Sequence, residues 1–237
     1  MRALRRKAQP APGSLPPRRG DTLAIVVAVA PLSFLQPTPP AEDVDERVVL
    51  PGISWDRYEA LLGFLGDDFP GVRVTYLEGA LELMSPSRSH EAIKTMFARL
   101  IETYAMEARL DLNGYGSTTF RKRAKKRGAE PDECWSLGVM GKVPDIAFEV
   151  MWTSGGIDKL ALYQGLGVPE VWLWKAGAIA IHLLGPKGYR KARRSRILPA
   201  LDVAELARFL ERADQTPAAI EYREALRAKI GGPGRAP

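Results

Sequence analysis

Apolar residues in the middle of the chain recur with two different periods, which predict helices and strands in alternation. From residue 90 to 109 they recur every three or four positions, which predicts a long amphipathic helix. Over residues 72–83 apolar and polar residues alternate on either side of a Glu-Gly pair, which predicts a β-hairpin. A shorter one-face pattern at 54–66, opened by a serine cap, predicts another helix.

The alternation continues to about residue 212. Strand-like segments lie at 112–115, 118–120, 143–152, 169–174 and 178–184, and short helices are expected at 157–166 and 203–210. This pattern predicts a mixed α/β (α+β) fold. A chain of 237 residues accommodates one such domain with tails, because a second core would leave little room for linkers.

The two ends of the chain depart from this pattern. Residues 1–47 contain eight prolines, a density that opposes regular structure and predicts a flexible lead-in. We therefore expect the domain over residues 48–212 and a weakly held helical tail over 213–237. An apolar stretch at 23–35 is shorter than the ~20 residues that span a bilayer. We expect no membrane partner, with surface association through this stretch as the alternative.

The cysteine and histidine content limits the expected cellular compartment and the type of metal ion that the protein could bind. Cys134 is the only cysteine, so an internal disulfide and a multi-cysteine zinc site are excluded, and a reducing, cytoplasmic location is expected. His90 and His182 are the only histidines. Any catalytic metal must then be held mainly by carboxylate oxygens, which favours Mg²⁺, or Mn²⁺, over zinc.

Two acidic residues share one face of the predicted strand at 143–152. Asp145 and Glu149 lie on that face, while the apolar residues around them lie on the other. Carboxylates on a central strand are costly to desolvate unless they are paired or bound to a cation, although the second face of the strand could instead meet water. Residues four apart on a strand lie ~13 Å from each other. Glu149 therefore needs a partner from another strand, and Asp132 in an upstream Pro-Asp pair is the preferred one.

A lysine could complete a site for phosphodiester hydrolysis. Lys159 lies ten residues after Glu149, on the predicted helix 157–166, where its ammonium could reach back towards a phosphate. A carboxylate-bound Mg²⁺ would neutralise charge on the phosphate and activate a water. The alternative for Lys159 is a side chain that faces solvent, as helix lysines usually do.

Two basic runs concentrate the formal net charge of +6. The first, placed directly before the Asp132 segment, is Arg121, Lys122, Arg123, Lys125, Lys126 and Arg127. The second is Lys187, Arg190, Lys191, Arg193, Arg194 and Arg196. Such runs predict phosphate contacts and salt-sensitive binding of nucleic acid, although solvated loops are the alternative. No pattern of a sequence-reading DNA-binding motif is found.

Several motifs in fixed order carry a family resemblance. They are Glu82-Leu83-Met84-Ser85-Pro86, His90, Glu130-Pro131-Asp132-Glu133-Cys134, Pro144-Asp145 to Glu149-Val150, Asp158-Lys159, Tyr163 and Gly167-Val168-Pro169-Glu170-Val171-Trp172. Together they resemble the Uma-type restriction endonucleases of the PD-(D/E)xK nuclease superfamily over residues 48–212. The resemblance implies a restriction-endonuclease-like mixed central sheet flanked by helices, a divalent cation between acidic residues of adjacent strands, and nucleic acid, most readily DNA, as substrate. The resemblance is also compatible with a homodimer.

The resemblance also assigns roles. It implies that Asp132, Asp145 and Glu149 serve the metal and that Lys159 is the catalytic lysine, displaced onto the following helix. The superfamily's usual lysine position is occupied by Met151.

Two further positions belong to this set. Ala80 stands where many relatives carry a glutamate, and Glu82 on the same strand face is the candidate substitute. His90 could contact a phosphate, orient an acid, or be an ordinary helix-terminal histidine. The sequence therefore predicts a Mg²⁺-dependent endonuclease, with a decayed nuclease scaffold that binds nucleic acid or a protein partner as the alternative.

Overall fold

The structure is a computed structural model that describes residues 43–66, 71–152 and 156–230. All the described residues belong to one compact unit. The apolar stretch at 23–35 and most of the predicted lead-in lie outside the described residues. Within the described ranges, none of the helices combines the length and apolar character that crossing a bilayer requires.

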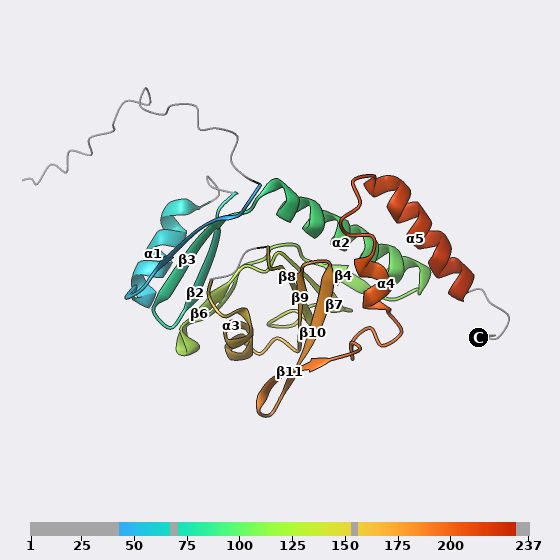
Figure 1. The fold of residues 1–237 in the computed structure, drawn as a ribbon. Helices are drawn as coiled ribbons and strands as arrows, with labels where there is room; N and C mark the ends of the chain where they lie inside the picture. Colours follow the sequence, from blue (N-terminus) through green and yellow to red (C-terminus); the bar gives the residue numbers. More distant parts are fainter. Residues whose placement is uncertain (1–42, 67–70, 153–155, 231–237) are drawn as a thin grey trace, which may run out of the picture. The chain divides into compact units, whose positions relative to one another are not determined.

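One sheet has five antiparallel strands in the order β1-β3-β2-β6-β5 (Figure 1). Its strands are β1 (Glu46–Leu50), β2 (Arg73–Leu77), β3 (Ala80–Ser85), β5 (Phe120–Lys122) and β6 (Arg127–Ala129), with a 3-10 turn at Arg123–Lys125. The predicted hairpin is confirmed as β2–β3. Its turn residues Glu78 and Gly79 both have positive φ, as a tight two-residue hairpin turn requires. Helix α1 (Trp55–Leu65), capped by Ser54, packs against this sheet.

The other sheet has six strands in the order β11-β10-β9-β8-β7-β4. Its strands are β4 (Leu112–Gly114), β7 (Glu133–Leu137), β8 (Ile146–Val150), β9 (Glu170–Lys175), β10 (Ala178–Gly185) and β11 (Gly188–Ala192). Strands β8 and β9 pair in parallel, with α3 (Lys159–Leu166) as the crossover helix between them, and the remaining pairs are antiparallel. The mixed α/β class is confirmed, and the described strands are divided between two sheets.

Helix α2 (Arg88–Glu107) covers one face of β8, and the predicted long helix is therefore confirmed. The rings of Phe97 and Phe148 stack with centroids 3.7 Å apart. Two further helices, α4 (Val203–Ala207) and α5 (Gln215–Ile230), complete this core. Tyr222 of α5 is fully buried, so the segment predicted as a weakly held tail packs against α2 as part of the core.

Helix α3 lies over the opposite face of β8. Its Leu162 and Tyr163 are buried in a second apolar cluster that includes Ala147 of β8. All five residues of β8 are buried. The alternative of a strand with one wet face is therefore wrong, and the acidic face of β8 is enclosed beneath α3.

Candidate active site

Strands β7 and β8 bring two carboxylates together. Glu133 pairs with Phe148 in antiparallel register, so the preceding Asp132 and the following Glu149 are neighbours across the two strands. Asp132 Oδ2 accepts a hydrogen bond of 2.7 Å from the backbone N–H of Val150. The exposed fractions of Asp132 and Glu149 are 1% and 2%. The sequence-based pairing of these two acids is the arrangement that the structure has.

Lys159 faces this pair from the first turn of α3. Its Nζ lies 3.1 Å from Glu149 Oε2, and the side chain is buried rather than directed to solvent. Asp158 caps the helix by accepting from the N–H of Ala161 and so fixes where the helix begins. Burial alone would lower the pKa of Lys159, but the nearby carboxylates, Glu149 first, outweigh it and raise that pKa.

Tyr163 lies one turn further along α3, on the same face as Lys159. Its hydroxyl donates to Glu149 Oε1, so each oxygen of Glu149 has a protein partner. Burial raises the pKa of Glu149 to about 7; Lys159 opposes this shift and the charge of Asp132 adds to it. Sequence reasoning gave Tyr163 no role, although its spacing of four residues from Lys159 places both on one helix face.

His90, in the first turn of α2, lies between two carboxylates. Its Nδ1 is 2.9 Å from Asp45 Oδ2, and its Nε2 is 3.0 Å from Asp132 Oδ1, an ion-pair contact. Burial opposes protonation, but Asp132 and Asp45 outweigh it and raise the pKa of His90 to about 9. Of the roles considered for His90, the geometry matches that of orienting an acid.

Asp45 also accepts from the backbone N–H of Ser87, the residue that caps α2. It is buried, and β1 begins at Glu46, so ordered structure starts before the predicted domain boundary at residue 48. Sequence reasoning placed Asp45 in the lead-in and missed it, because a lone Asp after a proline-rich segment carries no local signal of a distant partner.

Glu82 reaches the same cluster from β3 of the other sheet. Its Oε2 accepts from the N–H of Ile157 at 2.9 Å and lies 3.6 Å from Nε of Arg47. Its charge contributes to the raised pKa of Lys159, so the two groups are close. Glu82 is 1% exposed. The structure thus brings the candidate substitute for the position of Ala80 to the cluster.

Asp145 does not join the cluster, in contrast to the sequence-based assignment. Its Oδ2 accepts from the N–H of Leu137 at 3.0 Å, and it lies directly before β8, which begins at Ile146. Glu149 is four residues further on, ~13 Å along a regular strand. Strand β8 pairs with β9 over all of Ile146–Val150 and with β7 over Ile146–Phe148, so no bend brings Asp145 back to the other acids.

The residues of the cluster fit a small hard cation. Mg²⁺ is held in proteins by one or two carboxylates together with water and substrate oxygens, and Asp132 and Glu149 supply such a pair. Within the ranges that the structure describes, no three or more His, Cys, Asp or Glu residues converge as a complete cage. The donor chemistry therefore suits Mg²⁺ or Mn²⁺ on two carboxylates rather than a metal that the protein encloses.

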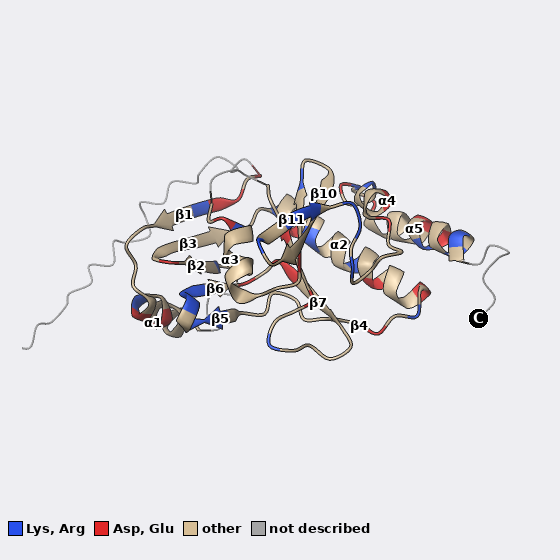
Figure 2. Cartoon of the chain, turned by 90° about the horizontal axis from the view of Figure 1, so that it is seen from below, with Lys and Arg blue, Asp and Glu red and all other residues tan. Residues whose placement is uncertain are grey.

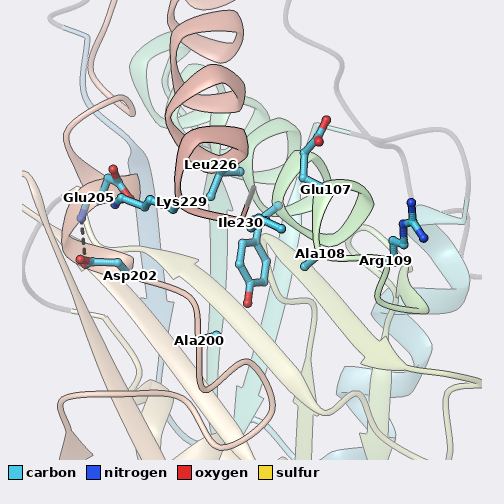
Figure 3. A pocket seen from close by; sticks show the side chains of 10 residues that line it. Glu107, Ala108, Arg109, Ala200, Asp202, Glu205, Leu226, Lys229 and Ile230 are labelled. Atoms are coloured by element: carbon cyan, nitrogen blue, oxygen red, sulfur yellow. Dashed lines mark hydrogen bonds and ion pairs between the residues drawn. The ribbon is translucent and has the colours of Figure 1, made fainter. Parts of the chain in front are cut away.

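A cavity of about 500 Å³ lies elsewhere, between α2, α4 and α5 (Figure 3). Tyr104 in its lining is 14 residues past His90, about 21 Å along α2 at 1.5 Å per residue. Two acids of its wall are already paired, Glu107 with Arg223 and Arg227, and Glu205 with Lys229. This cavity contains none of the cluster residues.

The first basic run forms the β5–β6 hairpin, and Figure 2 shows Lys and Arg there and on β11. Arg123 pairs with Asp56 and Glu59 of α1, and Arg127 pairs with Glu78. Four members of the run are exposed and have no ion pair with any described residue; these are Arg121, Lys122, Lys125 and Lys126. Strand β6 leads from this hairpin directly to the Asp132 segment.

The second basic run includes β11, for which no strand was predicted. Its basic residues are exposed, and Arg194 Nη1 donates to the backbone of Pro199.

Comparison with known proteins gives a family and a fold neighbour. The sequence model of the family described as "Uma2: Putative restriction endonuclease" matches residues 55–219. Among solved structures, a "putative nuclease belonging to DUF820" from Anabaena variabilis ATCC 29413 is similar, at 12% sequence identity and a TM-score of 0.42. The match covers 58% of this chain and 90% of that one. No curated protein matches the chain.

Proposed function

Because the chain belongs to the Uma2 family of putative restriction endonucleases, we propose that it is a Mg²⁺-dependent endonuclease that hydrolyses phosphodiester bonds of DNA. Membership gives the nuclease class and a nucleic-acid substrate. The metal, the preference for DNA and the residues that act are our proposal.

The observation that carries the proposal is the ion pair of Lys159 with Glu149, beside Asp132 on the neighbouring strand. Three charged side chains in an apolar interior are costly unless they serve each other or a ligand. Burial and the charge of Asp132 raise the pKa of Glu149 even with Lys159 at 3.1 Å. The cost of burying two neighbouring carboxylates, to which their mutual repulsion adds, favours a divalent cation at the pair.

Each residue of the cluster has a separate part in the proposal. Asp132 and Glu149 would hold Mg²⁺, which supplies a polarised phosphate and an activated water when bound. Lys159 places positive charge beside the position where negative charge develops on the phosphate. His90 holds Asp132 and Tyr163 holds Glu149, which fixes the directions of the two acids.

Two departures from the superfamily pattern suggested a decayed site. The lysine absent at Met151 is matched by Lys159, whose ammonium contacts Glu149. The glutamate absent at Ala80 is matched by Glu82, whose charge acts on Lys159. Both compensations favour an active enzyme over the decayed scaffold that we considered as the alternative.

We also propose that the β5–β6 hairpin contacts the backbone of the substrate. Its four basic residues without an ion pair in the described part of the chain are exposed and lie on the segment that leads to Asp132. Each phosphate that they neutralise should contribute ~0.9 to the salt dependence of binding to duplex DNA.

The test is cleavage of supercoiled plasmid, single-stranded DNA and RNA with Mg²⁺ or Mn²⁺, with chelator as the blank. We expect wild type to cut DNA and Glu149→Ala to lose cutting by at least a hundredfold. Glu224→Ala on the exposed face of α5 removes the same charge away from the cluster and should cut normally. The decayed scaffold would be favoured if wild type cuts none of these substrates and binds DNA in a salt-sensitive way that does not depend on the metal.

A further inference from the structure

Two side chains at the beginning of strand β1 contact residues of the acidic cluster. Asp45, just before the strand, and Arg47, within it, are two residues apart and therefore point to the same face. Asp45 forms an ion-pair contact with His90, which contacts Asp132 through its other ring nitrogen. Arg47 forms an ion-pair contact with Glu82. The edge strand thus supports acids of the site at two separate points.

Arg47 is largely buried at its guanidinium end but lacks strong acceptors among the described residues. Its side chain is 10% exposed, and its Nε lies 3.6 Å from Glu82 Oε2, within ion-pair range but too long for a hydrogen bond. Its Nη2 donates to the thioether of Met84 at 3.2 Å, which is a weak acceptor. The buried Nε–H of Arg47 has no hydrogen-bond partner among the described residues, and Nη2 has only the weak thioether acceptor.

The chain beside Arg47 allows no side chain. A Cβ added at Gly156 would lie 2.4 Å from Arg47 Nη1 and 2.4 Å from Glu82 Oε2. The next residue, Ile157, donates its N–H to Glu82, and Lys159 follows two residues later. The guanidinium is therefore held against the backbone that leads into the catalytic helix, on the same side of β3 as Glu82.

A largely desolvated guanidinium whose Nε–H has no acceptor is costly unless a ligand supplies one. We propose that Arg47 is a substrate-binding residue that donates to the non-bridging oxygens of a backbone phosphate next to the Asp132–Glu149 pair. A planar guanidinium matches two phosphate oxygens at once, which an ammonium such as that of Lys159 does not. This inference rests on the proposed function and names a group that recognises its phosphodiester substrate.

The experiment measures binding of a fluorescent 20-base-pair duplex by anisotropy in Ca²⁺, over a series of salt concentrations. Arg47→Gln should weaken binding at least tenfold and lower the logarithmic salt slope by ~0.9, the contribution of one phosphate. The affinity of Arg47→Lys should lie between those of wild type and Arg47→Gln. Lysine keeps the positive charge but cannot donate to two phosphate oxygens at once. Arg208→Gln removes an exposed arginine of the α4 region and should bind within twofold of wild type.

A second measurement separates binding from support of Glu82. The rise in melting temperature on adding Mg²⁺ should be the same in Arg47→Gln as in wild type. The inference is overturned if Arg47→Gln binds DNA with wild-type affinity and slope, or if it loses the Mg²⁺ response together with DNA binding. Arg47-dependent DNA binding by a wild-type protein that never cuts would sustain this inference and reject the proposed nuclease activity.

Discussion

Every oxygen of the two central carboxylates has a partner within the protein. Glu149 contacts Lys159 and Tyr163, while Asp132 contacts Val150 and His90. Such partners fix the direction in which an acid presents its remaining lone pairs. At this scale the site is defined by the residues that hold the acids as much as by the acids themselves.

His90 is the positioning residue whose loss should be easiest to measure. Because it holds Asp132 and does not itself contact the metal in our proposal, His90→Gln should weaken Mn²⁺ binding about 10- to 100-fold. Isothermal titration calorimetry measures this affinity directly. His182→Gln, on β10, is the matched control and should bind Mn²⁺ like wild type. Equal affinity in all three proteins would contradict the role given to His90.

The same histidine predicts how stability depends on pH. The pKa of His90 is about 9 in the folded protein, above its ordinary value near 6.5, because Asp132 and Asp45 outweigh burial. Its stabilising contribution is therefore complete below about pH 6.5 and is lost as the pH rises through 9. In chelator, the difference in unfolding free energy between wild type and His90→Gln should shrink over that range. A difference that is constant or grows with pH would contradict a raised pKa of His90 in the folded protein.

At the scale of elements, the segment before α3 is held by contact with β1 and β3. Gly156→Ala would push its methyl group into Arg47 and Glu82, and Glu82 is already fixed by Ile157. We expect a loss of about 1–3 kcal/mol in unfolding free energy and a lower rate of DNA cutting.

A second glycine provides the control for that change. Gly63 is exposed within α1 and has nothing within 4 Å of an added Cβ, so Gly63→Ala should stabilise the fold by about 0.5–1 kcal/mol. Urea unfolding of both variants tests the pair of predictions. A neutral Gly156→Ala would mean that the guanidinium and the carboxylate move aside freely.

The elements also show what the sequence could predict. Helix α2, the β2–β3 hairpin and the two faces of β8 follow from local periodicity, and the pairing of Asp132 with Glu149 follows from the length limit along one strand. Strands β1, β6, β7 and β11 were not predicted. Proline density concealed the short pattern of β1, and the basic runs concealed those of β6 and β11.

The metal role assigned to Asp145 stays a prediction. Direct contact would require a bend, whereas β8 pairs regularly with β9 over Ile146–Val150. The contacts of Asp45 and Arg47 join residues more than 30 positions apart, and no local pattern signals such contacts.

At the scale of the whole molecule, the site needs both sheets. Glu82 comes from the five-stranded sheet, Asp132 and Glu149 come from the six-stranded sheet, and His90 and Lys159 come from helices. The cluster can therefore assemble only when these elements are packed together, so loss of global structure and loss of the site should coincide.

Cys134 offers a probe of that coupling, since it lies on β7 two residues after Asp132. The thiol is fully buried and donates to the carbonyl of Gly116, and burial raises its pKa to about 12. We expect negligible reaction with a disulfide reagent at pH 8 in the native state and complete reaction in urea. Rapid labelling of the native protein would show that β7 opens without global unfolding.

The most direct test of the account is a crystal structure of the protein soaked in Mn²⁺, with the ion located by its anomalous scattering. We predict one ion bound by carboxylate oxygens of Asp132 and Glu149, with Lys159 close by and Asp145 making no contact. An ion held at Asp145 instead, or Asp132 and Glu149 both left without an ion at saturating Mn²⁺, would contradict the central claim.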